Sequence, residues 1–96
     1  MRNAFIVSYD ICDPTRWRKV YKAMVGWGDH IQYSVFVCNL SERDKARMMA
    51  KLDTLIHHKE DQVLVIDLGP WAGRGKRAVA ALGQPYAPRE RTALVV

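Results

Sequence analysis

A single carboxylate follows the first apolar run of the chain. Residues 5–7 are apolar and predict a short buried strand that ends at Tyr9, and Asp10 comes directly after it. The end of a strand in a rigid sheet holds a side chain in a fixed place, which a metal site needs. Mg²⁺ in proteins commonly takes one or two carboxylates and keeps several waters. Asp10 is therefore a candidate metal ligand, although a residue that only begins a turn would occupy the same position.

One carboxylate per chain makes a weak metal site, and a dimer would supply a second carboxylate. In a two-fold dimer the same surface meets itself, so two Asp10 side chains could face one another. A metal ion between them could orient a water molecule and neutralise charge on a phosphodiester. This is the chemistry of a nuclease, and it makes Asp10 the candidate catalytic residue.

The residues around Asp10 each have a structural interpretation as well. Asp13 precedes Pro14 and an apolar helical stripe, which is the pattern of a helix N-cap, so it is a secondary candidate for the site. Tyr9 is a candidate nucleic-acid contact, although an aromatic residue here is more commonly part of the core. Three basic residues of the following helix could bind phosphates or could be solvated charges: Arg16, Arg18 and Lys19.

The charge of the chain favours a polyanionic partner. The 96 residues carry a formal net charge of +5 and have a pI of about 9.5. The stretch from Gly69 onward has five basic residues against Glu90 alone, so it carries +4 of this charge. Such a balance concerns association and does not specify a fold. The candidate nucleic-acid contacts in this stretch are Arg74, Lys76 and Arg77.

Cysteines and hydropathy both indicate an intracellular protein. Cys12 and Cys38 lack the spacing of a zinc site, and a single disulfide would be unusual inside a cell. The apolar run near the start is too short for a signal peptide, and no apolar run approaches the length of a membrane span. We expect a cytoplasmic protein that does not contact membranes.

The apolar spacing predicts alternating strands and helices. The helices are marked by a cap at Asp13 and by a variant capping box from Ser41 to Asp44. No turn dipeptide marks a hairpin near Ser34, so the region around it is one strand or two. The predicted elements are a strand at 4–9, a helix at 14–25, extended structure at 30–40, a helix from the capping box to Ile56, and a strand at 61–68.

The sequence changes character at Gly69. Glycines and prolines interrupt it, a short helix is compatible with 76–82, and 92–96 is typical of a strand. A terminal strand needs an edge to pair with, in the same chain or in a second copy. We therefore divide the chain into a core at 1–69 and a basic C-terminal arm with a terminal strand at 70–96.

This order of elements predicts an α+β protein with a ferredoxin-like open sheet and two helices on one face. RNA-recognition domains share that arrangement and are a rival interpretation. Their aromatic and basic-glycine strand motif is absent around Tyr33 and Phe36.

Two runs of residues taken together carry a family resemblance. The first is Tyr9-Asp10-Ile11, and the second is Ile-Gln-Tyr-Ser-Val-Phe at 31–36. The sequence resembles the small ferredoxin-like CRISPR-associated endoribonuclease family, the lesser of the two universal spacer-acquisition proteins, over about residues 3–69. The other matching residues are Asp13, Arg16, Arg18, Lys19, Val20, Gly28, Leu40, Asp61, Gln62, Val63, Ile66 and Leu68.

The resemblance implies a homodimer whose terminal strand commonly crosses to the partner subunit, which would explain 92–96. It implies that Asp10 binds Mg²⁺ (or Mn²⁺) and catalyses cleavage of single-stranded RNA or, in some members, duplex DNA. Phe36 is a secondary candidate of the same site. The resemblance also implies a complex with the larger CRISPR integrase, in which family members bridge integrase dimers and hold DNA, a role for which the Asp need not be essential.

The chain departs from the family pattern in places. His30 and Trp17 stand where basic or polar residues are frequent, which weakens the expected phosphate contacts. The tail from Gly69 is longer and more basic than in many relatives, which favours duplex binding. Three functions remain open: a metal-dependent endonuclease with paired Asp10, a non-catalytic DNA-binding scaffold between integrase dimers, and a ribonuclease toxin of similar fold unrelated to CRISPR.

Overall fold

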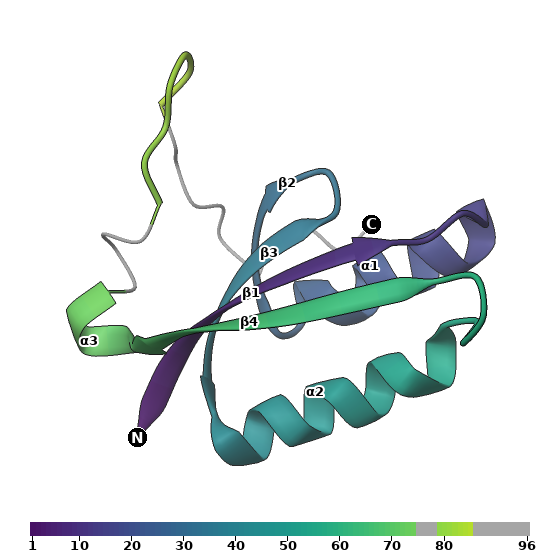
Figure 1. Ribbon diagram of the computed structural model, residues 1–96, viewed down its shortest axis with the longest axis horizontal. Helices are drawn as coiled ribbons and strands as arrows, with labels where there is room; N and C mark the ends of the chain where they lie inside the picture. Colours follow the sequence, from purple (N-terminus) through teal and green to yellow (C-terminus); the bar gives the residue numbers. More distant parts are fainter. Residues whose placement is uncertain (75–78, 86–96) are drawn as a thin grey trace.

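The structure is a computed structural model that describes residues 1–74 and 79–85. Strands and helices alternate along the described chain as the sequence predicts (Figure 1). In chain order the elements are β1 (Arg2–Asp10), α1 (Pro14–Val25), β2 (Gly28–Gln32), β3 (Val35–Ser41), α2 (Glu42–Leu55), β4 (Gln62–Pro70) and the short α3 (Trp71–Arg74).

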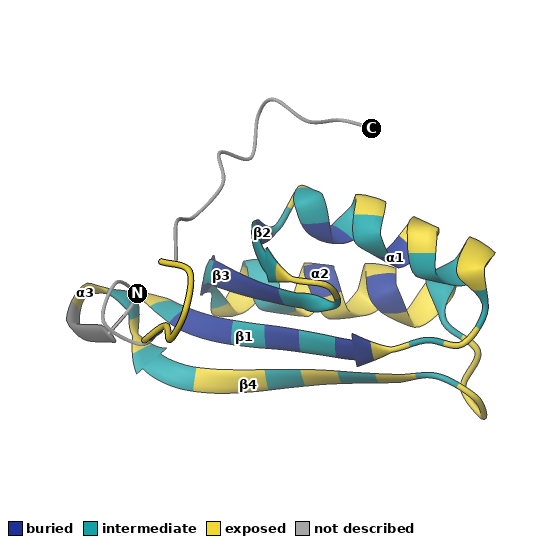
Figure 2. Ribbon diagram, turned by 90° about the horizontal axis from the view of Figure 1, so that it is seen from above, coloured by how far each residue is buried: buried dark blue, intermediate teal, exposed yellow. Residues whose placement is uncertain are grey.

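The strands of the described chain form one antiparallel sheet in the order β2-β3-β1-β4. Helices α1 and α2 both lie on the same side of this sheet, as Figure 2 shows. An antiparallel sheet with split βαβ connections and two helices on one face is the ferredoxin-like arrangement. The predicted fold class is confirmed.

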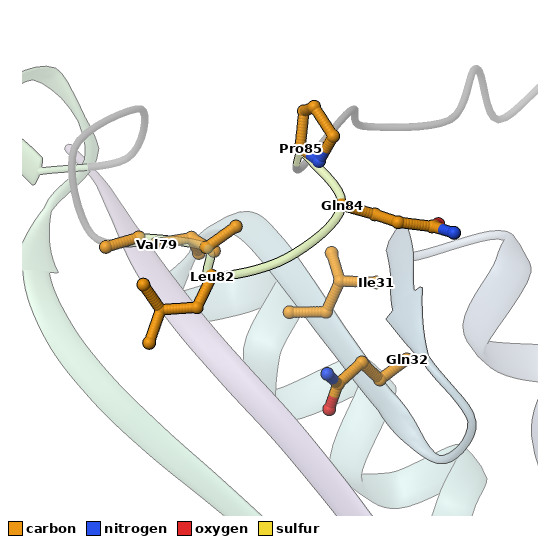
Figure 3. A pocket seen from close by; sticks show the side chains of 8 residues that line it. Ile31, Gln32, Val79, Leu82, Gln84 and Pro85 are labelled. Carbon is orange, nitrogen blue, oxygen red and sulfur yellow. The ribbon is translucent and has the colours of Figure 1, made fainter.

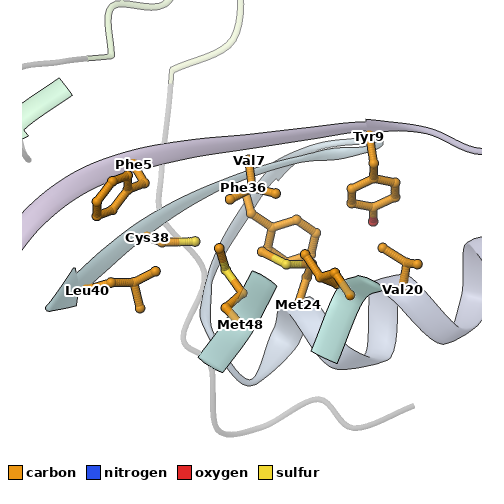
Figure 4. Close-up of a cluster of buried hydrophobic side chains, with 10 residues drawn as sticks. Phe5, Val7, Tyr9, Val20, Met24, Phe36, Cys38, Leu40 and Met48 are labelled. Atoms are coloured by element: carbon orange, nitrogen blue, oxygen red, sulfur yellow. The ribbon is translucent and has the colours of Figure 1, made fainter. Parts of the chain in front are cut away.

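The core lies between the sheet and the two helices (Figure 4). Every second residue of the central strand β1 enters it, namely Phe5, Val7 and Tyr9. Successive side chains of a strand point to opposite faces, so the residues between them lie on the other side. The remaining buried members of the core are Val20, Met24, Phe36, Cys38, Leu40, Met48 and Leu52.

The sheet face opposite the two helices is apolar, and we call it the open face. Strand register and alternation place together on it Ile6, Val35, Val37, Leu64 and Ile66. Leu64 and Ile66 are 47% and 45% exposed, whereas Val37 of the same face is only 3% exposed and is covered. The same alternation along β1 places Ser8 and then Asp10 on this face.

Residues 30–40 form two strands, which answers the question that the sequence left open. Tyr33 and Ser34 make the turn between β2 and β3. Neither residue has a positive φ, so the turn needs no glycine or asparagine and leaves no turn signature in the sequence. Side chains hold it instead: the Trp17 indole donates to Ser34 Oγ at 2.9 Å, and His30 Nε2 lies 3.1 Å from Tyr33 O.

Both predicted helix caps are present. The Asp13 carboxylate accepts from the Arg16 backbone N–H at 2.9 Å, and Ser41 Oγ accepts from the Asp44 N–H at 3.1 Å. Asp44 does not return the bond as glutamate would in a full capping box, and its carboxylate lies 3.7 Å from the Arg2 guanidinium. The caps therefore set the starts of α1 and α2 as predicted.

The C-terminal arm is described in part. Strand β4 runs through Gly69 and Pro70, two residues beyond the predicted stop, and α3 follows. In the predicted helix at 76–82, residues 79–82 are described and are not helical. Residues 76–78 and the predicted strand at 92–96 lie outside the described residues. No helix in the described chain is long and apolar enough to cross a membrane.

A cavity of about 390 Å³ lies where residues 79–85 pass over β2 (Figure 3). Its described lining is apolar or amide in character and includes Ile31, Gln32, Val79, Leu82, Gln84 and Pro85. Because none of these described side chains is ionisable or nucleophilic, the cavity offers no acid, base or metal ligand.

Strand β2 approaches β3 closely at Gly28, which pairs with Cys38. A methyl group on Gly28 would meet Cys38 Sγ and would lie 2.6 Å from the Val37 carbonyl oxygen. We predict that Gly28→Ala lowers the free energy of unfolding by about 1–3 kcal/mol, because the strands must separate. Thermal denaturation measures this change.

Gly26→Ala is the matched control for that substitution. At Gly26 the nearest heavy atom is Ala23 O at 3.5 Å, and the backbone is right-handed helical. Alanine fits there, so we expect an unchanged or slightly raised melting temperature. Equal losses in the two variants would contradict the close approach at Gly28.

Candidate active site at the end of strand β1

Asp10 is the last residue of β1 and is exposed. It pairs with Gln62 of β4, and the preceding Tyr9 N–H donates to Ser34 O at 3.1 Å on the other side. Among the residues that the structure describes, none forms a hydrogen bond or ion pair with the Asp10 carboxylate. The carboxylate is therefore held by a central strand and is open to a ligand.

Arg16 forms an ion pair that the sequence did not predict. Its Nε donates to Asp61 Oδ2 at 2.8 Å, and its terminal nitrogen lies 3.2 Å from Asp61 Oδ1 and 3.1 Å from Glu60 Oε1. The Asp61 side chain is 0% exposed and also accepts from the His57 backbone N–H at 2.8 Å. This ion pair connects the first turn of α1, which follows Asp10 in the chain, to the loop before β4, the strand that pairs with Asp10.

The Asp61 carboxylate is stabilised in its charged form. The hydrogen bond from Arg16 holds the pKa of Asp61 below its ordinary value, and the His57 N–H acts in the same direction. A phosphate at Arg16 would compete with a buried, oriented carboxylate. The nucleic-acid contact predicted for Arg16 stays a prediction, and the structure adds a clamp that fixes the loops beside Asp10.

Of the α1 residues predicted to contact phosphates, Arg18 and Lys19 remain open. Both are exposed, and within residues 1–74 and 79–85 neither forms an ion pair. Their predicted role as phosphate contacts stays a prediction and is compatible with this exposure. Of the predicted contacts in the arm, Arg74 ends α3 with its side chain outside the description, and Lys76 and Arg77 lie outside the described residues.

Tyr9 and Phe36 lie in the core, not on a surface (Figure 4). Their rings are 6.3 Å apart, centroid to centroid, and Tyr9 is 4% exposed. Burial raises the pKa of the Tyr9 phenol far above its ordinary value, which makes ionisation of this side chain still less favourable. Any contribution of Tyr9 or Phe36 to the site would act through the packing beneath Asp10.

The donor set fits a hydrated Mg²⁺ ion bound at Asp10. Its exposed carboxylate supplies the oxygen ligand that this cation prefers. Asp13 and Asp61 are engaged by the α1 cap and by Arg16, and no group of three or more metal-ligating side chains occurs in the described chain. Further ligands must be waters, substrate phosphates or a second copy of Asp10.

The family described as CRISPR associated protein Cas2 matches residues 3–74. The chain belongs to the Cas2 family. Within this family it is 43% identical to a CRISPR-associated endoribonuclease Cas2 from Rhodospirillum rubrum, over 98% of the chain and 91% of that protein. It is 41% identical to the CRISPR-associated endoribonuclease Cas2 of Geobacter sulfurreducens, over the full length of both.

Solved structures similar to this Cas2-family chain have the same fold. A hypothetical protein from Thermus thermophilus superimposes with a TM-score of 0.78 at 26% identity, covering 93% of this chain and 100% of that one. Cas2 from Streptococcus pyogenes superimposes with a TM-score of 0.73 at 29% identity, covering 83% and 99% of the two chains. The family resemblance that the motifs predicted is confirmed.

Proposed function

We propose that this chain is a metal-dependent endoribonuclease of a CRISPR system, whose active form is a homodimer that pairs two Asp10 carboxylates. The two relatives from Rhodospirillum and Geobacter, which share 43% and 41% of residues with it, are named endoribonucleases. The observation that carries the proposal is the place of Asp10: an exposed carboxylate at the end of a central strand, on the same sheet face as an exposed apolar patch.

The open face supports the dimer. Exposed apolar faces of this kind mark interaction surfaces, and a two-fold contact uses the same patch on both copies. Leu64 and Ile66 would be covered by their counterparts, and Asp10 follows Ile6 and Ser8 on that face. A copy packed there would bring its Asp10 toward the first one. The terminal strand at 92–96, predicted to pair across the dimer or within the chain, would extend this contact.

The residues of the site have distinct tasks in this proposal. Asp10 would hold Mg²⁺, which when bound neutralises phosphate charge and favours the ionisation of a water. Arg18 and Lys19 would attract the RNA backbone. The buried, protonated Tyr9 keeps a rigid and dry layer beneath the strand end, and the Arg16–Asp61 pair holds the flanking loops. The protein thus supplies position and charge.

A second candidate function is a non-catalytic DNA-binding scaffold that bridges dimers of the larger CRISPR integrase. It is favoured by the exposed cations of α1, by a basic arm, and by the absence from the described residues of any group of three or more metal-ligating side chains. It uses the same dimer and would bind duplex DNA. A toxin unrelated to CRISPR is not proposed, because the chain belongs to the Cas2 family.

Metal removal tests the catalytic proposal. We expect the purified protein to cleave single-stranded RNA with Mg²⁺ or Mn²⁺, to lose the activity in EDTA, and to regain it when the metal is restored. The measurement is the rate of cleavage of an end-labelled RNA, with Asp10→Asn protein purified in parallel to detect contaminating nuclease. Cleavage that persists without metal would contradict the proposal. Binding of duplex DNA without any cleavage would favour the scaffold.

A further inference from the structure

Three aromatic rings are stacked at the end of the sheet where Asp10 lies. Tyr33, in the β2–β3 turn, stacks on Trp17 of α1 with ring centroids 4.9 Å apart and an interplanar angle of 22°. Trp17 stacks in turn on Tyr21, at 5.4 Å and 12°. The inner end of the stack meets the core, where the Tyr21 ring contacts Phe36 and the edge of His30. The outer end is Tyr33, which is 75% exposed.

Hydrogen bonds hold this stack in place. The Trp17 indole N–H donates to Ser34 Oγ at 2.9 Å, so the middle ring is tied to the turn that carries the outer one. His30 Nε2 lies 3.1 Å from Tyr33 O and braces the same turn. Stacking on Trp17 covers one face of the Tyr33 ring and leaves the rest of the side chain exposed. The outer face of Tyr33 is thus presented in a fixed orientation.

The stack lies at the same end of the sheet as the candidate active site, on the helix side, whereas Asp10 lies on the open face at the strand end. The Tyr9 N–H donates to Ser34 O at 3.1 Å, and Asp10 is the next residue of β1. Figure 2 shows the exposed β2–β3 turn beside the end of β1 and α1. Arg18 and Lys22 follow Trp17 and Tyr21 by one residue along α1, and both are exposed. The helix that carries two rings of the stack therefore also presents exposed cations, on a neighbouring side of the helix.

We propose that Tyr33, supported by Trp17, is a stacking site for an unpaired base of single-stranded RNA bound next to Asp10. Every base has a π-face, so an aromatic platform beside a basic surface binds single strands with little sequence selectivity. A base inside a duplex is already stacked and cannot lie on Tyr33. The substrate class rests on the proposed function, and the inference adds the residue that would select single strands over duplexes.

Binding without cleavage is the appropriate test, because it separates this site from catalysis. The Asp10→Asn protein would be titrated, in EDTA, with a short single-stranded RNA that carries one 2-aminopurine, a base whose fluorescence falls on stacking. We expect adding Tyr33→Ala to weaken binding roughly ten-fold or more and to abolish the quenching. Tyr33→Phe keeps the ring and should stay within about two-fold of the parent.

Two further measurements control this test. Met49→Ala removes a different exposed apolar side chain, from α2, and should leave the affinity unchanged. A duplex of the same sequence should bind the parent and the Tyr33→Ala variant equally. Melting temperatures verify that every variant is folded, which we expect because Tyr33 is largely exposed.

Three results would overturn the stacking site. They are an unchanged single-strand affinity in Tyr33→Ala, an equal loss for single strands and duplexes, or the absence of single-strand binding by the parent. A Tyr33→Ala variant that binds RNA normally but fails to dimerise would assign the ring to a protein contact and would also overturn it. If Tyr33 is required for binding while Asp10-containing protein cleaves nothing with metal, the stacking site stands and the proposed catalytic function is wrong.

Discussion

Asp10→Asn is expected to lower the rate of Mg²⁺-dependent RNA cleavage by at least about 100-fold while leaving the fold and the dimer intact. The substitution keeps the size of the side chain and removes the charge that a divalent cation requires. Because Asp10 is exposed and has no partner in the described chain, its loss should not destabilise β1. Single-turnover cleavage and size-exclusion chromatography measure the two parts of this expectation.

Mixing the two proteins distinguishes a shared site from two independent ones. If both Asp10 side chains of a dimer are needed, random exchange with an equal amount of Asp10→Asn protein leaves only about a quarter of all dimers active. The total activity would then be about a quarter of that of the same amount of parent protein, whereas independent sites would keep about half of it. Full activity of the Asp10→Asn protein would refute catalysis by this carboxylate and would favour the non-catalytic scaffold.

Elements with local determinants were predictable from the sequence. The caps at Asp13 and Ser41 act within three residues, and the apolar stripe of α1 and the strand before Asp10 depend on short periodic patterns. The family resemblance depended on the same local runs at 9–11 and 31–36. These features carry most of their information in neighbouring residues.

Features that depend on tertiary contacts were missed. The pairing of Arg16 with Asp61 joins residues 45 apart in sequence, and a lone Asp before a strand gives no sign of its partner. The β2–β3 turn is held by Trp17 from another element, so no glycine or asparagine marks it. Trp17 and Tyr21 belong to the apolar stripe of α1, and only the exposed Tyr33 stacked against Trp17 shows that this stripe reaches the surface.

The Arg16–Asp61 pair also changes how the basic residues near Asp10 are interpreted. From the sequence, Arg16, Arg18 and Lys19 are equivalent phosphate contacts. In the structure, Arg16 is occupied by Asp61 and by Glu60, whereas Arg18 and Lys19 are open. Within one helix, Arg16 thus stabilises the fold, whereas Arg18 and Lys19 are available to bind a ligand. The net charge of +5 does not distinguish these two roles.

Asp61→Asn is therefore expected to destabilise the protein and to loosen the candidate site. The carboxylate accepts two hydrogen bonds from Arg16 and one from His57, and its side chain is wholly buried. The amide can replace only part of this set and leaves the Arg16 charge without its main partner. We expect the melting temperature to fall by roughly 5–15 °C, measured by circular dichroism at neutral pH.

Glu60→Gln is the matched control, because it changes the neighbouring residue and the same arginine. The Glu60 side chain is 59% exposed, and exposed ion pairs contribute little. Its melting temperature should stay within about 2 °C of the parent. A similar fall of the melting temperature in Glu60→Gln and Asp61→Asn would show that the burial of Asp61 does not account for its effect on stability.

The stabilisation by the charged Asp61 carboxylate should depend on pH in a characteristic way. Arg16 lowers the pKa of Asp61 in the folded state, so the folded form binds this proton less readily than the unfolded form. The stabilisation is then complete above the ordinary pKa of an aspartate and is lost as the pH falls toward the lower folded value. The difference in melting temperature between the parent and Asp61→Asn should be constant near neutrality and should shrink below about pH 4. A difference that persists unchanged in acid would mean that Asp61 acts through shape and packing, without a contribution from its charge.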